Sequence, residues 1–256
     1  MRIYTKESLI EALKEIRDLG WIPNARHGNS GGVGNTLEDL LDIPENNLPI
    51  PNASEWELKC QRLGTSSLTT LFHVEPSPRA LRFVPQLFLK YYGWPHQSEP
   101  GEMSFRQTIT GLARTDRGFG ITIDRVHRKI LVSFDSDAVD SRHVAWLASV
   151  ADHVGLEELD PQPYWGFDDL GHKVGTKLPN CFYVRARVKK ENGREFYQYC
   201  EISVLEGCDF EGFLSCLENG MILVDFDAKT THNHGTKFRL RQNCLPNLYS
   251  RVTVID

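Results

Sequence analysis

The feature that most constrains the fold is a pair of alternating segments joined by Asn192-Gly193. Residues 182–204 read FYVRARVKKENGREFYQYCEISV, with the Asn-Gly pair near the middle of a β-prone run. Asn-Gly is the favoured sequence for a two-residue turn in which both central residues have positive φ. The segment therefore predicts a β-hairpin, and with it a sheet that contains antiparallel strands.

Other runs in the C-terminal half predict more of this sheet. Residues 209–220 predict a short helix that ends at Asn219-Gly220, and strand-like runs follow at 221–228, 236–241 and 248–255. Residues 119–135 also alternate, on either side of Asp124-Arg125. We expect a mainly antiparallel sheet with a helix packed against it.

The N-terminal part predicts helices before the first strands. Thr5 can cap a helix in which Leu9, Leu13 and Ile16 share one face, and Gly20 would end it. A glycine-rich loop within 24–43 runs into a second predicted helix capped by Asn35 or Thr36. This loop is typical of an anion-binding turn and equally of a flexible surface turn. Residues 55–59 and 66–74 predict neighbouring strands.

Composition limits the class of protein. The chain of 256 residues is 40% hydrophobic and 25% charged, which suits one large α/β domain or two lobes that share a core. Six cysteines lie outside any C-x-x-C pair, so buried thiols are expected rather than a zinc site. The N-terminus lacks a signal-peptide pattern and no apolar run reaches membrane-spanning length, so we expect an intracellular protein, in the cytoplasm. The net charge of -5 disfavours indiscriminate nucleic-acid binding, although a locally basic cleft stays possible.

Glu57 and Lys59 form the first candidate site. Alternation puts both on one face of a strand, with Leu58 directed into the core. The Glu57 carboxylate and the backbone carbonyl of Leu58 could hold a hard cation such as Mg²⁺, while Lys59 orients an attacking water. E-x-K is a common pattern, and a surface salt-bridge strand is the alternative. Asn52 stands five residues before Glu57, where a second carboxylate would complete such a site.

The segment 229–241, KTTHNHGTKFRLR, is the second candidate site. It carries four cations and two histidines but no acidic residue. Its charge is therefore positive, whereas the net charge of the whole chain is negative. His232-x-His234 could be half of a metal site, and a solvated strand turn is the plain alternative.

Several segments, in this order, resemble the MvaI/BcnI restriction endonucleases, relatives of the mismatch-repair nickase MutH among the PD-(D/E)XK nucleases. They are GGVGNTLEDLL (31–41), ENNLPIPN with ELK (45–59), SSLTTLF (66–72), LENGMILVDFD (217–227) and THNHGTKFRL (231–240). The resemblance implies an α/β MutH-like fold with two lobes around a DNA-binding cleft. It implies a single nuclease domain, 1–256, with a catalytic lobe at about 1–150 and a recognition lobe at about 151–256.

The resemblance also implies roles for individual residues. Asn52 takes the place of the family's metal-binding aspartate, Glu57 and Lys59 complete the catalytic motif, Glu38 would lie near the metals, and His73 could face the scissile phosphate. Glu38 and His73 could equally be a solvated helix acid and a structural histidine. The metal would be held by Asn52, Glu57 and the Leu58 carbonyl. The implied DNA-contacting residues are Asp225, Asp227, Lys229, His232, Asn233, His234, Lys237 and Arg239.

The implied activity is Mg²⁺-dependent cleavage of double-stranded DNA at a short, G/C-rich, nearly palindromic site by a monomer that works beside a DNA methyltransferase. Two residues depart from the family pattern. Asn52 removes a negative charge from the metal site, which predicts weak metal binding and little cleavage. Asp227 stands where the resemblance expects a guanine-reading arginine. A MutH-like nicking repair endonuclease and a catalytically dead DNA-binding module are the alternatives.

Overall fold

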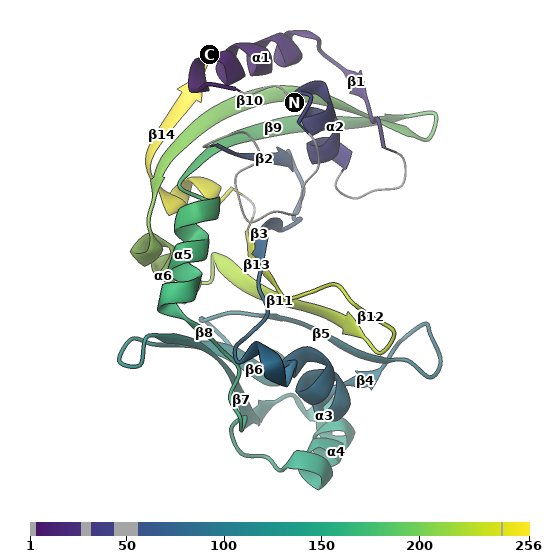
Figure 1. Cartoon of the computed structure of the whole chain (residues 1–256). Helices are drawn as coiled ribbons and strands as arrows, with labels where there is room; N and C mark the ends of the chain where they lie inside the picture. The colour runs from purple at the N-terminus through teal and green to yellow at the C-terminus, as the bar shows by residue number, and fades with distance from the viewer. Residues whose placement is uncertain (1–3, 27–31, 44–55, 242) are drawn as a thin grey trace. The chain divides into compact units, whose positions relative to one another are not determined.

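The computed structural model describes residues 4–26, 32–43, 56–241 and 243–256 (Figure 1). Backbone contacts divide the chain into two compact units that interleave along the sequence. Unit 1 comprises Met1–Ser67, His172–Gly212 and Gln242–Asp256, and unit 2 comprises Leu68–Gly171 and Phe213–Arg241. This division differs from the expected lobes 1–150 and 151–256. The reason is that β2 (Glu57–Arg62) pairs in parallel with β9 (Asn180–Glu191), and a parallel pair needs a long connection, which here contains most of unit 2.

Unit 1 is built on a five-stranded sheet. The strand order is β1-β10-β9-β2, and β14 pairs with β10. The remaining bounds are β1 Ile22–Pro23, β10 Arg194–Cys208 and β14 Tyr249–Ile255. Strands β9 and β10 form the predicted hairpin, in which Asn192 has φ 49° and Gly193 has φ 79°. The hairpin prediction is therefore confirmed.

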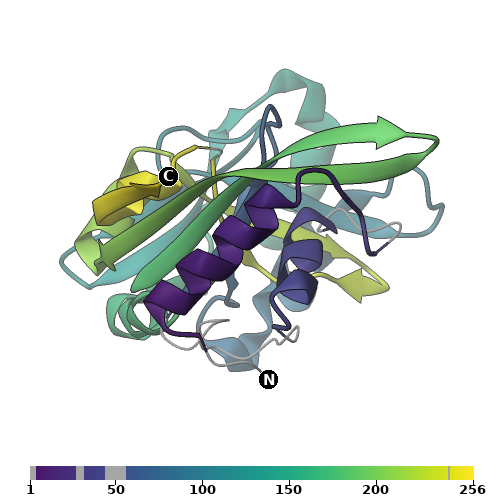
Figure 2. The same ribbon diagram turned by 90° about the horizontal axis from the view of Figure 1, so that it is seen from above.

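Two helices, α1 (Lys6–Asp18) and α2 (Gly32–Leu40), pack on one face of this sheet (Figure 2). Thr5 caps α1 through a capping box with Ser8, as the sequence predicts. Leu9, Leu13 and Ile16 join Leu58 and Phe182 in the core of unit 1. Because the apolar side chains of α1 share this core with Leu58, the opposite face of β2 is directed away from the helices.

The predicted cap of α2 at Asn35 or Thr36 is wrong, because the helix begins at Gly32. A Cβ atom on Gly32 would lie 2.7 Å from the hydroxyl oxygen of Tyr197, so only glycine allows this approach. Thr36 lies inside the helix, is 1% exposed, and accepts a hydrogen bond from the amide of Ala25 at 3.3 Å. Close packing on the sheet therefore overrides the local capping preference.

Unit 2 contains two sheets. The larger has the order β3-β13-β11-β5-β4 with β12 paired to β11, and the smaller has the order β6-β7-β8. The predicted pairing of the strands at 55–59 and 66–74 is therefore wrong, because β3 lies in a different sheet from β2. The bounds are β3 Thr69–His73, β4 Trp94–Pro95, β5 Met103–Ile109, β6 Arg117–Asp124, β7 Lys129–Val139, β8 Tyr164–Gly166, β11 Ile222–Lys229, β12 His232–Asn233 and β13 Lys237–Leu240. Every pair within these sheets is antiparallel, as expected.

The remaining helical segments occur in both units. They are 3₁₀ turns at Arg79–Leu81, Ser141–His143 and Leu245–Leu248, a π-helix at Val84–Leu89, and helices α3 (Lys90–Tyr92), α4 (Val144–Val154), α5 (Phe167–Lys177) and α6 (Phe210–Glu218). The core of unit 2 is aromatic: Phe88 stacks on Phe105 with ring centroids 4.7 Å apart, and both rings contact Phe226. Among the described helices, none combines the length and apolar character that crossing a bilayer requires.

Candidate functional site

Glu57 is a buried carboxylate at the start of β2. Its side chain points away from Leu58, which packs in the core beneath α1 and α2. Glu57 is 1% exposed, and its Oε1 atom accepts a hydrogen bond from Nζ of Lys59 at 2.6 Å. The predicted strand geometry, with Glu57 and Lys59 on one face, is confirmed. Their pairing is buried, unlike the exposed salt-bridge strand that was the alternative.

Lys177, in the last turn of α5, is a further member of this cluster that sequence reasoning missed. Its Nζ lies 3.0 Å from Oε2 of Glu57, and its side chain is 13% exposed. Oε2 is a buried carboxylate oxygen that makes this ion pair but accepts no hydrogen bond. A signal was available, since Leu170, Val174 and Leu178 recur at helical spacing.

Neutral groups surround these charges. Cys181 lies opposite Glu57 in the β2–β9 register, and burial raises the pKa of its thiol to about 12. Burial also raises the pKa of Tyr249 well above its usual value and that of Tyr183 to about 12. The Tyr183 hydroxyl donates to Gln61, whose amide nitrogen is buried without a hydrogen-bond partner. At neutral pH the thiol and the two phenols are uncharged, so Glu57 and the two lysines carry the charge of this cluster.

The cluster meets the requirements of a divalent metal in part. The Oε2 atom of Glu57 accepts no hydrogen bond and is a hard ligand, and Leu58 can add a backbone carbonyl. In the part of the chain that the structure describes, no group of three or more acidic, histidine or cysteine side chains is placed to hold a metal. Asn52 lies outside the described residues, as does most of the glycine-rich loop before α2. The described donor set therefore supplies one carboxylate, balanced by two lysines.

Glu38 and His73 fall in different surroundings. Glu38 lies on α2. Burial is the main cause that raises the pKa of the Cys60 thiol, and the negative charge of Glu38 is a smaller one. The Cys60 side chain lies on the face of β2 opposite to Glu57. His73 ends β3 in unit 2, opposite Lys237 of β13, and its ring lies close to Gly235. The structure thus groups His73 with the segment 229–241. A role for Glu38 near the metal, and for His73 at the scissile phosphate, stays a prediction.

The larger sheet of unit 2 has one polar and one apolar face. Asp225, Asp227 and Lys229 alternate with the buried Val224 and Phe226 along β11. Cross-strand registers place four more polar residues beside them. On this polar face lie Arg106 and Thr108 of β5 and Lys237 and Arg239 of β13. One face of an antiparallel sheet therefore carries most of the predicted DNA-contacting side chains.

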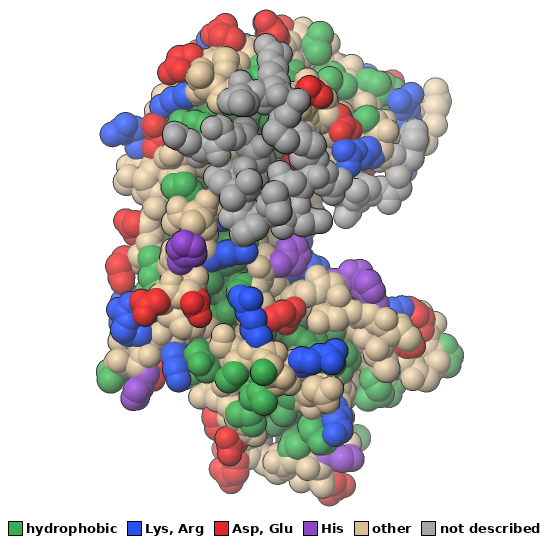
Figure 3. Space-filling view, viewed as in Figure 1, with side chains coloured by type: hydrophobic (Ala, Val, Ile, Leu, Met, Phe, Trp, Pro, Cys, Tyr) green, Lys and Arg blue, Asp and Glu red, His purple; other side chains and the backbone are tan. Residues whose placement is uncertain are grey.

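Acids of this face, which lie outside the segment 229–241, pair with its cations. Arg239 Nη1 lies 2.9 Å from Asp225 Oδ2, and Asp225 Oδ1 also accepts from Thr108 at 2.9 Å. Asp227 lies 3.0 Å from Arg106 and 3.5 Å from Lys237. The segment 229–241 lacks acids in sequence, but the fold surrounds it with them, and charges of both signs are interspersed on the surface in Figure 3. Its basic character, inferred from the sequence, is therefore largely compensated.

His232, Asn233 and His234 are exposed at the tip of this sheet. His232 and Asn233 form β12, which pairs back on β11, and the rings of His232 and His234 contact edge to face at 4.2 Å. Beside the tip lies a pocket of about 350 Å³, between Lys229–Asn233 and residues 79–89. Arg79 and Arg82 are among its lining residues, so two arginines lie next to the histidine-bearing turn.

The chain is similar to a known protein family and to solved structures. A family model described as the MvaI/BcnI restriction endonuclease family matches residues 10–249. The solved structure of a restriction endonuclease MvaI–cognate DNA substrate complex is 26% identical, with a TM-score of 0.80 and coverage of 99% of this chain and 100% of that one. MvaI in the absence of DNA matches with 24% identity and a TM-score of 0.55 over 100% of both chains, which supports the fold. No match was found among curated protein sequences. With a family model matched over nearly its whole length, the chain belongs to the MvaI/BcnI restriction endonuclease family.

Proposed function

We propose that this protein is a site-specific endonuclease of double-stranded DNA that hydrolyses phosphodiesters at Glu57 and Lys59. The observation that carries the proposal is the buried carboxylate of Glu57 between two lysine ammonium groups. A carboxylate suits a metal, and ammonium groups suit a phosphate. The MvaI relative, solved with its DNA substrate, supports double-stranded DNA as the ligand of this chain.

Each residue of the cluster has a distinct task in this proposal. Lys59 orients the attacking water, and Lys177 offsets the charge of the phosphate that approaches Glu57. Glu57, the Leu58 carbonyl and the Asn52 side chain would hold Mg²⁺, which supplies Lewis-acid polarisation of the phosphate and a more acidic water when bound. Because Asn52 is uncharged, the carboxylates supply less negative charge than a hard divalent cation prefers. We therefore expect weak metal binding and little cleavage by this chain.

Recognition is proposed to take place on the polar face of the unit 2 sheet. Two guanidinium–carboxylate pairs lie there, Arg239 with Asp225 and Arg106 with Asp227. A guanidinium matches the acceptors of guanine and a carboxylate accepts from the cytosine amino group, so each pair presents what one G·C base pair requires. Arg106, which is half exposed, supplies the guanidinium that the sequence of β11 lacks. This supports a short G/C-rich site.

The wider setting of the proposal follows from family membership. The enzyme would act as a monomer in the cytoplasm, beside a methyltransferase that protects the host's copies of the site. A second candidate, a DNA-binding module without cleavage, is favoured by Asn52 alone. A nicking enzyme would stop at open-circular plasmid, which separates it from an enzyme that cuts both strands.

Selection from a pool of random duplexes tests the proposal. The protein as it exists is incubated with the pool in EDTA, and retained duplexes are sequenced. We expect enrichment of a short, G/C-rich, nearly palindromic motif, and an affinity that falls as salt rises because phosphate contacts release counterions. The proposal fails if no motif is enriched and the protein shows no salt-dependent affinity for DNA.

A further inference from the structure

Three glutamates from outside the segment 229–241 hold the turn that carries His232, Asn233 and His234. Glu99 and Glu102 lie on the connection between β4 and β5, and Glu75 follows β3. All three belong to unit 2. None of them was singled out by the sequence, because they are 129 to 161 residues away from the groups they bind, the two limits being Glu102 and Glu75.

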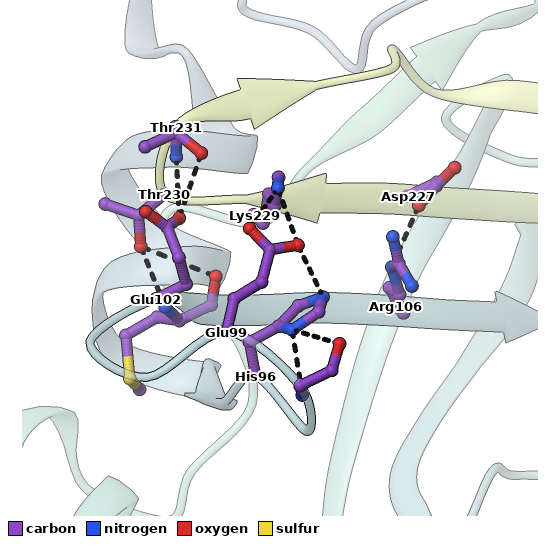
Figure 4. Close-up of polar contacts among 10 residues, drawn as sticks. His96, Glu99, Glu102, Arg106, Asp227, Lys229, Thr230 and Thr231 are labelled. Carbon is purple, nitrogen blue, oxygen red and sulfur yellow. Dashed lines mark hydrogen bonds and ion pairs between the residues drawn. The ribbon is translucent and has the colours of Figure 1, made fainter.

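Glu99 and Glu102 hold the start of the turn (Figure 4). Lys229 Nζ lies 2.8 and 2.6 Å from the two carboxylate oxygens of Glu99. Glu102 Oε2 accepts from both the backbone amide of Thr231, at 3.0 Å, and its hydroxyl, at 3.1 Å. Thr230 adds backbone and side-chain hydrogen bonds to Met103.

Glu75 holds the end of the turn. Its Oε1 accepts from the backbone amide of Thr236 and its Oε2 from the Thr236 hydroxyl, both at 2.9 Å. Thr236 is 0% exposed, so this end of the turn is fixed in the interior of unit 2. Glu102 and Glu75 repeat one motif, a carboxylate that binds the amide and hydroxyl of a single threonine.

Between these two anchors, the three residues of the tip are exposed and short of contacts to the rest of the unit. The described contacts of the tip include the short β12 pairing, the edge-to-face contact of the His232 and His234 rings, a hydrogen bond from the His234 amide to the Asp227 carbonyl at 3.0 Å, and one from the Gly235 amide to the Asn233 side chain at 2.9 Å. The anchoring glutamates thus supply a large part of what fixes the tip before DNA arrives. Preorganised groups lose less conformational entropy on binding.

We propose that Glu75 and Glu102 are positioning residues that preorganise His232, Asn233 and His234 for base recognition, and that Glu99 neutralises Lys229 against non-specific phosphate contacts. This inference rests on the proposed function. Glu75 and Glu102 restrict the motion of the tip. Glu99 stays paired with Lys229 until a cognate DNA sequence offers contacts that replace this ion pair. Discrimination between sites would then depend on residues that never touch a base.

The experiment compares dissociation constants for the selected duplex and for a scrambled duplex, in EDTA and over a series of salt concentrations. Glu102→Ala and Glu75→Ala should each lower affinity for the selected duplex about tenfold, with the scrambled duplex unchanged, as expected for charge-assisted hydrogen bonds. Glu102→Gln keeps one acceptor and should recover most of that loss. Glu218→Ala, which breaks a comparable ion pair with Arg125 at 2.9 Å, is the matched control and should change neither affinity.

Glu99→Ala should instead change the affinity for the scrambled duplex. It frees Lys229, so non-specific affinity should rise and the slope of log affinity against log salt should steepen by about 0.9, as for one more neutralised phosphate. The inference is overturned if the alanine variants at 75 and 102 keep the ratio of selected to scrambled affinity, or if the slope for Glu99→Ala matches that of the parent chain.

A change at the tip itself distinguishes failure of the positioning role from failure of the proposed function. His232→Ala combined with Asn233→Ala should abolish discrimination if the turn reads DNA. Loss of discrimination there, without loss in the glutamate variants, overturns the positioning role and leaves the proposed function intact. Unchanged discrimination in the tip variant contradicts the proposed recognition surface itself.

Discussion

Replacing Lys177 with methionine is the sharpest test of the charge arrangement around Glu57. Methionine keeps the unbranched, apolar stem of lysine and removes the ammonium group that lies 3.0 Å from Oε2 of the carboxylate. Glu57 is 1% exposed, so water cannot readily replace the lost partner. Its remaining ion-pair partner is Lys59, at 2.6 Å from the other oxygen.

The expected magnitude follows from this geometry. Two unit charges 3.0 Å apart attract by about 5 kcal/mol at an effective dielectric constant of about 20. Breaking a buried pair costs roughly 3–5 kcal/mol when one charge is left without a partner. Glu57 keeps Lys59, and removal of Lys177 also relieves repulsion between the two lysines, so we expect a loss of about 2 kcal/mol in the free energy of unfolding.

A double-mutant cycle isolates the pair. The free energy of unfolding is measured in urea for the parent chain, Lys177→Met, Glu57→Gln and the double variant. The methionine change should cost about 2 kcal/mol with Glu57 and much less with glutamine, since a neutral amide needs no counter-charge. Lys14→Met, on α1 of the same unit, is the control for loss of a lysine. A coupling energy below about 0.5 kcal/mol is typical of an exposed pair, and it would contradict a strong buried pair between Glu57 and Lys177.

Three further changes test other parts of the account. Arg106→Gln should weaken discrimination at one G·C position by about 1–3 kcal/mol, measured as the affinity for duplexes with single base-pair changes. Gly32→Ala should destabilise by about 1–3 kcal/mol because its Cβ would lie 2.7 Å from a buried tyrosine hydroxyl, whereas Gly34→Ala, with open space around it, should be neutral or stabilising in thermal unfolding. Arg62 holds the pKa of Glu195 below its usual value of 4.5, so the stability from this pair is present above about pH 4.5 and is lost as pH falls through the lowered pKa. The stability difference between the parent chain and Arg62→Gln should therefore shrink in acid, and a difference that grows on acidification would contradict the assignment.

Much of the local structure could be predicted because local signals agree with the tertiary environment. The Asn192-Gly193 turn, the Thr5 cap and the alternation at Glu57–Lys59 are set by neighbouring residues, and the structure bears out all three. The β2–β9 pairing could not be predicted from the sequence, because it joins strands separated by most of unit 2. Long-range pairing leaves little trace in local periodicity, so the interleaving of the two units could not be foreseen.

The charge balance of the site was the hardest property to predict. Lys177 meets Glu57 across 120 positions of sequence, and Arg106 meets Asp227 through a cross-strand register. A segment such as 229–241 looks basic by composition, yet its cations are compensated by acids that only the fold brings near. Sign and exposure of a surface are tertiary properties.

We propose that this chain is a DNA endonuclease whose metal site is centred on Glu57 and weakened by Asn52. Cleavage of supercoiled plasmid in Mg²⁺ by Asn52→Asp, beside the parent chain and the Asn52→Asp, Glu57→Gln double variant, tests it most directly. We expect the single variant to cut at discrete sites, the parent to cut little or not at all, and the double variant to lose the gained activity. A parent chain that cuts while Asn52→Asp stays inert, or a double variant as active as the single one, would contradict the claim.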